Sequence, residues 1–231
     1  MQITATVATE RNAPFEIREL DLARPGDEEV LVRIKGVGLC HTDLVAKDQF
    51  LQIPLPAVFG HEGSGIVEAV GSGVKDLAPG DPVVLSFGSC GHCTRCHQHL
   101  PCYCHTFPQL NFSGGRPDGT TPISQSGKPV SGMFFGQSSF ATHAISPRRN
   151  VVKVNATAPI EILGPLGCGI QTGVGSILNS LDCQPGSTLA IFGGGTVGLS
   201  AVMGARIRTC RTIIVVEPVE QRRCLALDLG A

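Results

Sequence analysis

A run of cysteines constrains the fold of this chain more than any other sequence feature. The stretch "SCGHCTRCHQHLPCYC" (89–104) places Cys90, Cys93 and Cys96 two residues apart, and Cys102 and Cys104 follow. Two-residue gaps let consecutive thiolates point into one tetrahedron around a zinc ion, and four protein ligands make such a site structural. We therefore expect a small metal-held lobe over about 89–105, and the spacing alone leaves the fourth ligand open between Cys102 and Cys104.

Other polar residues of this lobe have a simpler interpretation. Four histidines surround the cysteines, and we interpret them as solvated loop residues: His92, His97, His99 and His105. The cysteines elsewhere that no motif accounts for, Cys183, Cys210 and Cys224, are interpreted as small buried hydrophobes.

Composition limits the classes of function. The chain has 231 residues, 42% hydrophobic and 16% charged, which is typical of a soluble globular protein. A formal net charge of -1 provides no basic surface for nucleic acid. No apolar run is long enough to span a membrane, and the start "MQITATVATE" lacks the layout of a signal peptide. These features predict a cytoplasmic protein, where ten cysteines indicate metal binding or catalysis before disulfides.

The first part of the chain consists of short β-branched runs separated by glycine and proline. Examples are "EEVLVRIKGVGLC", "GHEGSGIVEAVGSGV", "PGDPVVLSF", "KPVSGMFFGQSSFATHAI" and "RRNVVKV". Short strands at such spacing predict a small all-β barrel or sandwich. The stretch from Ser113 to Lys128 is expected to be a long exposed loop.

The pattern changes after Pro159. Helical spacing interrupted by glycines comes first, followed by strand, glycine turn, helix, strand and helix up to Ala231. This order predicts a βαβ unit and the start of a doubly wound sheet. We place the domain boundary near Gly169, giving domains 1–169 and 170–231.

A glycine motif opens the predicted helix of this unit. In "AIFGGGTVGLSAV", Gly193, Gly195 and Gly198 follow an apolar strand with the spacing G-x-G-x-x-G. Glycines at these positions permit a tight turn and a close approach of backbone to a pyrophosphate. Glu217 ends the next strand, where a carboxylate accepts ribose hydroxyls and repels a 2′-phosphate, so the sequence favours NAD over NADP.

Three distant residues form a second candidate metal set. Cys40 lies in "GLCHTD", His61 in "GHEGSG" and Cys168 in "GPLGCGIQTG", each at the end of an apolar segment. Two thiolates and one imidazole leave a fourth coordination position open, as in a catalytic zinc site. From the sequence pattern alone, an interpretation of these three as unrelated buried residues is at least as good.

Several long blocks resemble a known family over essentially the whole chain. They are "GLCHTDL", "LPAVFGHEGSGIVEAVGSGV", "VLSFGSCGHC", "FFGQSSFATHA", "LGPLGCGIQTG" and "LSAVMGA". The sequence resembles the zinc-dependent medium-chain alcohol dehydrogenases, most closely the aryl-alcohol (benzyl-alcohol) dehydrogenase branch. The resemblance implies an α/β plus β fold, with a GroES-like β-barrel catalytic domain followed by a Rossmann domain. It further implies hydride transfer between a primary aryl or allylic alcohol and NAD, giving the aldehyde, and homo-oligomeric full-length relatives.

The same resemblance implies roles for individual residues. It assigns a catalytic zinc to Cys40, His61 and Cys168, and it selects Cys104 to complete the structural zinc, making two zinc ions per subunit. Asp43 would orient the ring of His61. The other implied roles concern four residues: Glu62 behind the metal, Thr42 passing the substrate proton, and His41 facing the cofactor pyrophosphate, with Val45 standing where some relatives end a proton relay in histidine.

Further residues are implied at the cofactor and the substrate. Thr172, Val197 and Arg222 match cofactor-binding positions, with Arg222 beside the adenosine ribose. The expected apolar walls of the substrate site are Leu51, Phe87 and Phe112, although residues of this kind are more often simply core.

Two alternatives and one expectation about length remain. The chain supplies two of the roughly six strands of a Rossmann domain, so we expect a C-terminally truncated product or an incomplete gene prediction. The alternatives are a glutathione-dependent formaldehyde dehydrogenase, which shares "CHTD" and "GHEG", and a non-catalytic zinc-binding fragment.

Overall fold

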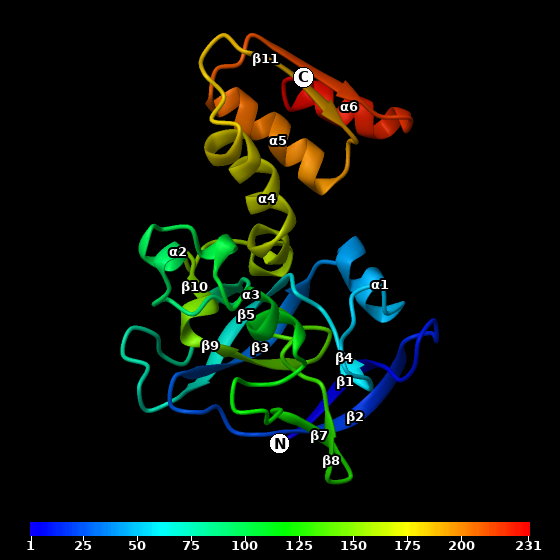
Figure 1. The fold of residues 1–231 in the computed structure, drawn as a ribbon, viewed down its shortest axis with the longest axis vertical. Helices are drawn as coiled ribbons and strands as arrows, with labels where there is room; N and C mark the ends of the chain where they lie inside the picture. Colours follow the sequence, from blue (N-terminus) through cyan, green and yellow to red (C-terminus); the bar gives the residue numbers. More distant parts are fainter. The chain divides into compact units, whose positions relative to one another are not determined.

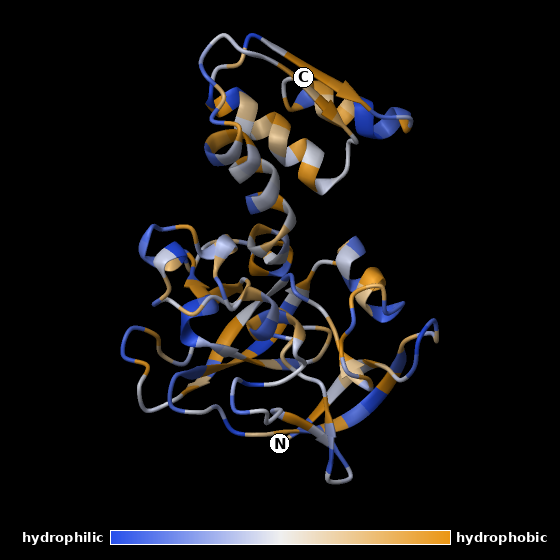
Figure 2. Ribbon diagram, in the orientation of Figure 1, coloured by the Kyte–Doolittle hydropathy of each residue, from blue (hydrophilic) through white to orange (hydrophobic).

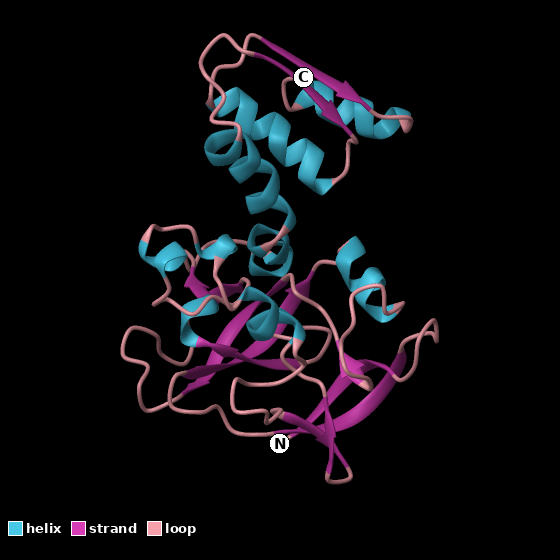
Figure 3. Cartoon of the chain, in the orientation of Figure 1, coloured by secondary structure: helices cyan, strands magenta, loops and turns pink.

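The computed structural model describes residues 1–231, which form two compact units. The first comprises Met1–Gly167 and the second Cys168–Ala231. The boundary therefore lies two residues before the predicted position at Gly169. Figure 1 labels many of the helices and strands, and Figure 3 shows that strands predominate in the first unit.

The first unit contains two five-stranded sheets. One has the order β4-β1-β2-β7-β8, with bounds β1 Gln2–Ala8, β2 Glu16–Leu22, β4 Ala57–Val58, β7 Ile123–Gln125 and β8 Lys128–Val130. The other has the order β10-β6-β5-β3-β9, with bounds β3 Glu29–Val37, β5 Gly63–Val70, β6 Pro82–Leu85, β9 His143–Pro147 and β10 Val151–Lys153. All of these strand pairs are antiparallel.

Strand β3 shows why an apolar run forms a strand here. Successive side chains of a strand point to opposite faces of the sheet. Leu31 accordingly packs in one core cluster with Ile3 and Ile145, whereas Val30 and Val32 pack in another. The predicted all-β character of the first unit follows from this use of both faces.

Two strand predictions need correction. The expected loop at 113–128 contains β7 and the start of β8, which pair across the two-residue turn Ser126-Gly127. Both turn residues have positive φ, 51° and 76°, as a tight hairpin turn of the twisted type requires. The block "KPVSGMFFGQSSFATHAI" is two strands rather than one, because a short 3-10 helix, η2 (Phe134–Gly136), separates β8 from β9.

Short helices connect the strands. They are α1 (His41–Lys47), α2 (Thr94–His97), η1 (Pro101–Tyr103), α3 (Phe107–Phe112), η3 (Arg148–Asn150), η4 (Ile160–Ile162) and η5 (Gly164–Gly167). The strand pattern of the sequence did not predict α1, α2 or α3.

The second unit is the predicted βαβ arrangement, preceded in the chain by a helical segment and followed by another helix. Its elements are α4 (Gly169–Gly175), η6 (Ser176–Ser180), β11 (Thr188–Phe192), α5 (Thr196–Ile207), β12 (Thr212–Val216) and α6 (Glu220–Asp228). β11 and β12 are parallel, and Figure 2 shows their hydrophobic composition. Helices α4 and α5 lie side by side (Figure 1), since a side chain at Gly173 would meet the Val197 carbonyl oxygen at 2.2 Å.

The core of this unit accounts for two of the isolated cysteines. Cys183 and Cys210 are buried with Ile191, Val202 and Ile213, as predicted. Cys224 is exposed, so its interpretation as a buried small hydrophobe is wrong. It lies on α6 and does not belong to this cluster. No helix among residues 1–231 combines the length and apolar character that crossing a membrane demands.

Candidate metal centres and dinucleotide turn

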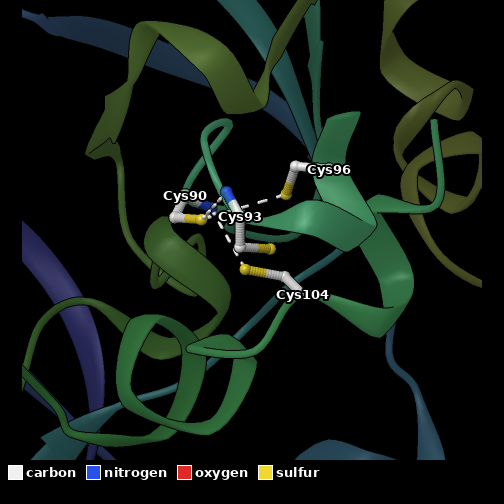
Figure 4. A group of neighbouring side chains, drawn as sticks. All are labelled: Cys90, Cys93, Cys96 and Cys104. Atoms are coloured by element: carbon white, nitrogen blue, oxygen red, sulfur yellow. Dashed lines mark hydrogen bonds between the residues drawn. The ribbon is translucent and has the colours of Figure 1, made fainter. Parts of the chain in front are cut away.

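Four cysteine sulfurs converge in the lobe that follows β6. Cys90, Cys93, Cys96 and Cys104 each offer a sulfur, and these atoms lie within 4.8 Å of one another (Figure 4). Cys104 is buried and Cys102 is exposed, so the structure brings Cys104 and not Cys102 to the group. The four neighbouring histidines are exposed and do not belong to it.

Backbone N–H groups organise these sulfurs. The N–H of Cys90 donates to Cys104 Sγ at 3.3 Å, and that of Cys93 donates to Cys90 Sγ at 3.3 Å. Hydrogen bonds to sulfur favour the thiolate, which is the form that binds metal. The backbone of His105 in this way lowers the pKa of Cys93 to about 6, whereas burial raises the pKa of Cys96 to about 11. Metal binding by this set must therefore release protons.

A second group forms from segments far apart in the sequence. Cys40, His61, Glu62 and Cys168 each offer one donor atom, and these atoms lie within 4.8 Å of one another. Cys40 directly precedes α1, His61 and Glu62 precede β5, and Cys168 precedes α4. Nε2 of His61 is buried without an ordinary hydrogen-bond partner. A buried imidazole nitrogen beside two sulfurs is the donor set that suits zinc.

Asp43 holds this group from behind. Its side chain is 0% exposed. Oδ1 accepts hydrogen bonds from Gly60 N at 3.1 Å and lies 2.9 Å from His61 Nδ1, while Oδ2 accepts from Cys40 N at 3.0 Å. A carboxyl oxygen at Nδ1 fixes the proton there and leaves the Nε2 lone pair for a metal. Burial lowers the pKa of His61, but hydrogen bonds with Asp43 and Cys40 outweigh it and raise the pKa to about 9, so a metal that binds at Nε2 must displace a proton.

The position of Glu62 depends on two glycines that the sequence analysis did not single out. A side chain at Gly38 would meet Glu62 Oε2 at 1.9 Å, and a side chain at Gly164 would meet the Glu62 carbonyl oxygen at 2.0 Å. Real Cβ atoms do not approach so closely, so both positions require glycine. The glycines are visible in the segments "GVG" and "LGP", but the need for them follows only from the position of Glu62 in the folded chain.

Aromatic rings surround the His61 imidazole. Phe135 stacks on it with ring centroids 4.5 Å apart and an interplanar angle of 23°, and Phe134 meets it edge-on at 5.5 Å. Phe135 has φ 50°, which is unusual for a bulky residue and is found where surrounding structure enforces it. Phe112 packs edge-on against Phe135 at 5.3 Å.

The other predicted residues of the first unit lie at varied distances from this group. Thr42 Oγ1 is 3.6 Å from Cys40 Sγ, and His41 is exposed as the first residue of α1. Of the expected apolar walls, Phe112 lies in the aromatic cluster just described. Phe87 packs on Phe107 at 5.6 Å, and Leu51 packs at the edge of the core around Phe59.

The glycine turn of the second unit has a distinct use for each glycine. Gly193 has φ +101°, and its N–H donates to Val216 O at 2.9 Å. A side chain at Gly198 would meet Gly193 O at 1.8 Å, so this glycine lets α5 pack against the turn. A side chain at Gly195 would meet nothing within 4 Å, which leaves open space where a ligand can approach the backbone.

Glu217 follows β12 and closes back onto this turn. Its Oε2 accepts from Gly194 N at 2.6 Å, and its Oε1 accepts from Val219 N at 2.9 Å. These two backbone hydrogen bonds lower the pKa of Glu217. Arg222 Nη1 lies 3.9 Å from Glu217 Oε2 and is largely exposed. The remaining predicted cofactor residues are exposed on helices of this unit, Val197 on α5 and Thr172 on α4.

Comparison with known proteins gives a consistent family. A geraniol dehydrogenase from Castellaniella defragrans is 54% identical over 98% of this chain and 61% of its own length. The crystal structure of a benzyl alcohol dehydrogenase from Acinetobacter calcoaceticus is 48% identical, with a TM-score of 0.95 over 100% of this chain and 62% of that one. An alcohol dehydrogenase zinc-binding domain protein from Burkholderia ambifaria is 52% identical, with a TM-score of 0.97 over 100% of this chain and 63% of that one.

The chain thus spans about three-fifths of the length of these relatives. Residues 26–156 match the family described as the alcohol dehydrogenase GroES-like domain, which confirms the resemblance and the fold class predicted from the sequence. The match covers more than half of the residues, and the two antiparallel sheets and the convergent thiols agree with it. The chain therefore belongs to the zinc-type alcohol dehydrogenase family with a GroES-like domain.

Proposed function

We propose that this chain carries the metal site and the first dinucleotide-binding elements of an oxidoreductase that interconverts a primary alcohol and its aldehyde using zinc and NAD. The observation that carries the proposal is the donor set of Cys40, His61 and Cys168, with a buried His61 Nε2 that has no ordinary partner. The names of the relatives, geraniol and benzyl alcohol dehydrogenase, favour an allylic or aryl alcohol over formaldehyde.

Cys40, His61 and Cys168 would hold one zinc ion, and Cys90, Cys93, Cys96 and Cys104 a second. When bound, the first zinc supplies Lewis acidity toward the substrate oxygen and NAD supplies the hydride acceptor.

The residues of the chain itself then have separate tasks. Asp43 keeps the proton of His61 on Nδ1, so that the imidazole binds through Nε2. The Thr42 hydroxyl, near Cys40, takes the proton of the substrate hydroxyl. Val45 has no ionisable group that could take the proton farther along α1, so water would have to carry it to the solvent. The rings of Phe135 and Phe112 exclude water and give an aromatic or allylic substrate an apolar wall.

The proposed preference for NAD rests on Glu217. A carboxylate whose pKa is lowered stays charged at neutral pH, and its charge opposes a 2′-phosphate near the ribose position. The exposed Arg222 is the group through which some NADP would be accepted. The ten thiols also suit a reducing compartment such as the cytoplasm.

The test uses this chain joined to the C-terminal segment of the geraniol dehydrogenase relative, because the matched relatives are longer. NADH formation is followed with geraniol, benzyl alcohol and the formaldehyde–glutathione adduct, and zinc is measured in the same samples. Turnover of geraniol or benzyl alcohol that is lost in Cys168→Ala supports the proposal. Preference for the glutathione adduct would favour the formaldehyde branch, and bound zinc without NAD binding would favour a non-catalytic zinc protein.

A further inference from the structure

Two buried carboxamide side chains lie next to the two candidate metal groups, although neither is a metal donor. Asn111 is 0% exposed and Gln137 is 1% exposed. The first borders the four-cysteine group and the second borders the group around His61. Each side chain engages its oxygen and its nitrogen with backbone atoms only.

Asn111, on α3, joins the two ends of the four-cysteine lobe. Its Oδ1 accepts from Gly88 N at 2.7 Å, and its Nδ2 donates to Gly88 O at 3.0 Å and to Phe107 O at 2.7 Å. Gly88 lies two residues before Cys90, and Phe107 lies three residues after Cys104. One amide therefore connects the chain entering the lobe to the chain leaving it, and so limits how far Cys90 and Cys104 can separate.

Gln137 makes the corresponding contacts at the other group. Its Nε2 donates to His61 O at 2.9 Å and to Ser86 O at 3.4 Å, and its Oε1 accepts from Gly63 N at 3.0 Å. The Ser86 hydroxyl donates in turn to Gly167 O at 3.1 Å, directly before Cys168. The amide is thus hydrogen-bonded to the backbone on both sides of Glu62. Through Ser86 it is also connected to Gly167, the residue before Cys168.

A matched apolar side chain cannot replace these contacts. Buried backbone N–H and C=O groups must find partners within the protein, and those that lose a partner move toward water or other groups. At Gln137 the displaced groups would belong to His61 and Gly63. At Asn111 they would belong to Gly88 and Phe107. In both cases a metal donor would shift with its own backbone or with that of a close neighbour.

We propose that Asn111 and Gln137 are positioning residues, each bracing one metal site: Asn111 the four-cysteine site, and Gln137 the site of Cys40, His61 and Cys168. The inference rests on the metal sites of the proposed function but not on alcohol oxidation. It predicts that replacing one carboxamide weakens metal binding at one site only, because each carboxamide contacts the backbone of one site and not of the other.

The experiment measures zinc release from the zinc-loaded chain of 231 residues to a chromogenic chelator. Cys40→Ser and Cys96→Ser identify which release phase belongs to which site. Gln137→Met removes all of the contacts of that amide, whereas Gln137→Glu keeps the acceptor for Gly63 N and loses the donor to His61 O. Asn111→Leu and Asn111→Asp form the parallel pair, and Ser146→Ala serves as the control, since Ser146 is buried with a hydroxyl that has no partner.

We expect Gln137→Met to weaken zinc binding at the His61 site alone by about 10- to 100-fold, the usual loss of affinity when a supporting contact is removed, and to speed zinc release accordingly. Asn111→Leu should do the same at the four-cysteine site alone, with the carboxylate variants intermediate and Ser146→Ala unchanged. Cobalt substitution gives a second readout, because the visible bands of a four-sulfur site differ from those of a site with two sulfurs and one nitrogen. Each variant should alter one band set.

Three outcomes would overturn the inference. One is equal loss of both metals in a variant, which indicates general unfolding rather than bracing. Another is unchanged release from both sites. The third is an unmodified chain that binds no zinc, which removes the sites and the braces together. Separable loss in a protein that oxidises no alcohol would leave the braces standing and contradict only the proposed function.

Discussion

Replacing Asp43 with asparagine tests the geometry of the His61 site most directly, because the change preserves shape and removes acceptor capacity. Both oxygens of Asp43 accept hydrogen bonds, Oδ1 from Gly60 N and His61 Nδ1 and Oδ2 from Cys40 N. An asparagine has one acceptor oxygen and one NH₂ group, which only donates. In either orientation its NH₂ group must face at least one buried N–H.

The magnitude follows from that count. If the NH₂ group faces Cys40 N, one buried N–H loses its acceptor, at a cost of about 1–3 kcal/mol in the free energy of unfolding. If it faces Gly60 and His61 instead, the Gly60 N–H loses its hydrogen-bond acceptor. The His61 Nδ1 must then accept from the NH₂ group, which moves the imidazole proton to Nε2, where a metal would bind. Zinc affinity at this site should then fall by about 10- to 100-fold.

Urea unfolding of the metal-free chain and chelator competition of the zinc-loaded chain measure the two effects. Asp118→Asn is the matched control, because Thr120 N and Oγ1 both bond to the same oxygen, Oδ1, at 2.9 and 2.8 Å. An asparagine there keeps both bonds, so stability should change by no more than about 0.5 kcal/mol. Equal stability and equal zinc affinity in Asp43→Asn and the unmodified chain would refute the reasoning.

Three further predictions concern separate parts of the chain. Cys104→Ser should lower zinc content and the thermal unfolding temperature, while Cys102→Ser leaves both unchanged; the reverse pattern would assign the fourth ligand to Cys102. In the length-extended protein, Glu217→Gln should narrow the preference for NAD over NADP, and an unchanged ratio of the two kcat/KM values would place selectivity elsewhere. Hydrogen bonds from Lys153 and from the Ala78 N–H lower the pKa of Asp81 below its ordinary 3.8. The unmodified chain should therefore be more stable than Asp81→Asn above pH 3.8, and this difference in the free energy of unfolding should vanish as the pH falls through the folded pKa. Urea midpoints from pH 7 to pH 2.5 check this, and a gap that widens in acid would contradict the sign.

The sequence by itself determined what depends on near neighbours in the chain. Cys90, Cys93 and Cys96 could be grouped because two-residue gaps bring thiols together within one turn, whatever surrounds them. The glycine turn at Gly193 could be predicted for the same reason, since Gly193 and Gly198 are required by the local backbone of the turn. The β-branched run of β3 likewise predicted a strand.

Tertiary structure decided whatever depends on contacts between distant segments. Cys40, His61 and Cys168 offer donor atoms within 4.8 Å of one another, and nothing in their spacing along the chain indicates it. Cys104 and Cys102 differ by burial, which adjacent letters do not encode.

The residues that sequence reasoning missed share one property: their partners lie far along the chain. Phe135 meets His61, Gly38 makes room for Glu62, and Asn111 and Gln137 bond to carbonyl and N–H groups that every residue possesses. Because a backbone partner leaves no trace in the letters of the sequence, only the folded chain could show which side chains it selects.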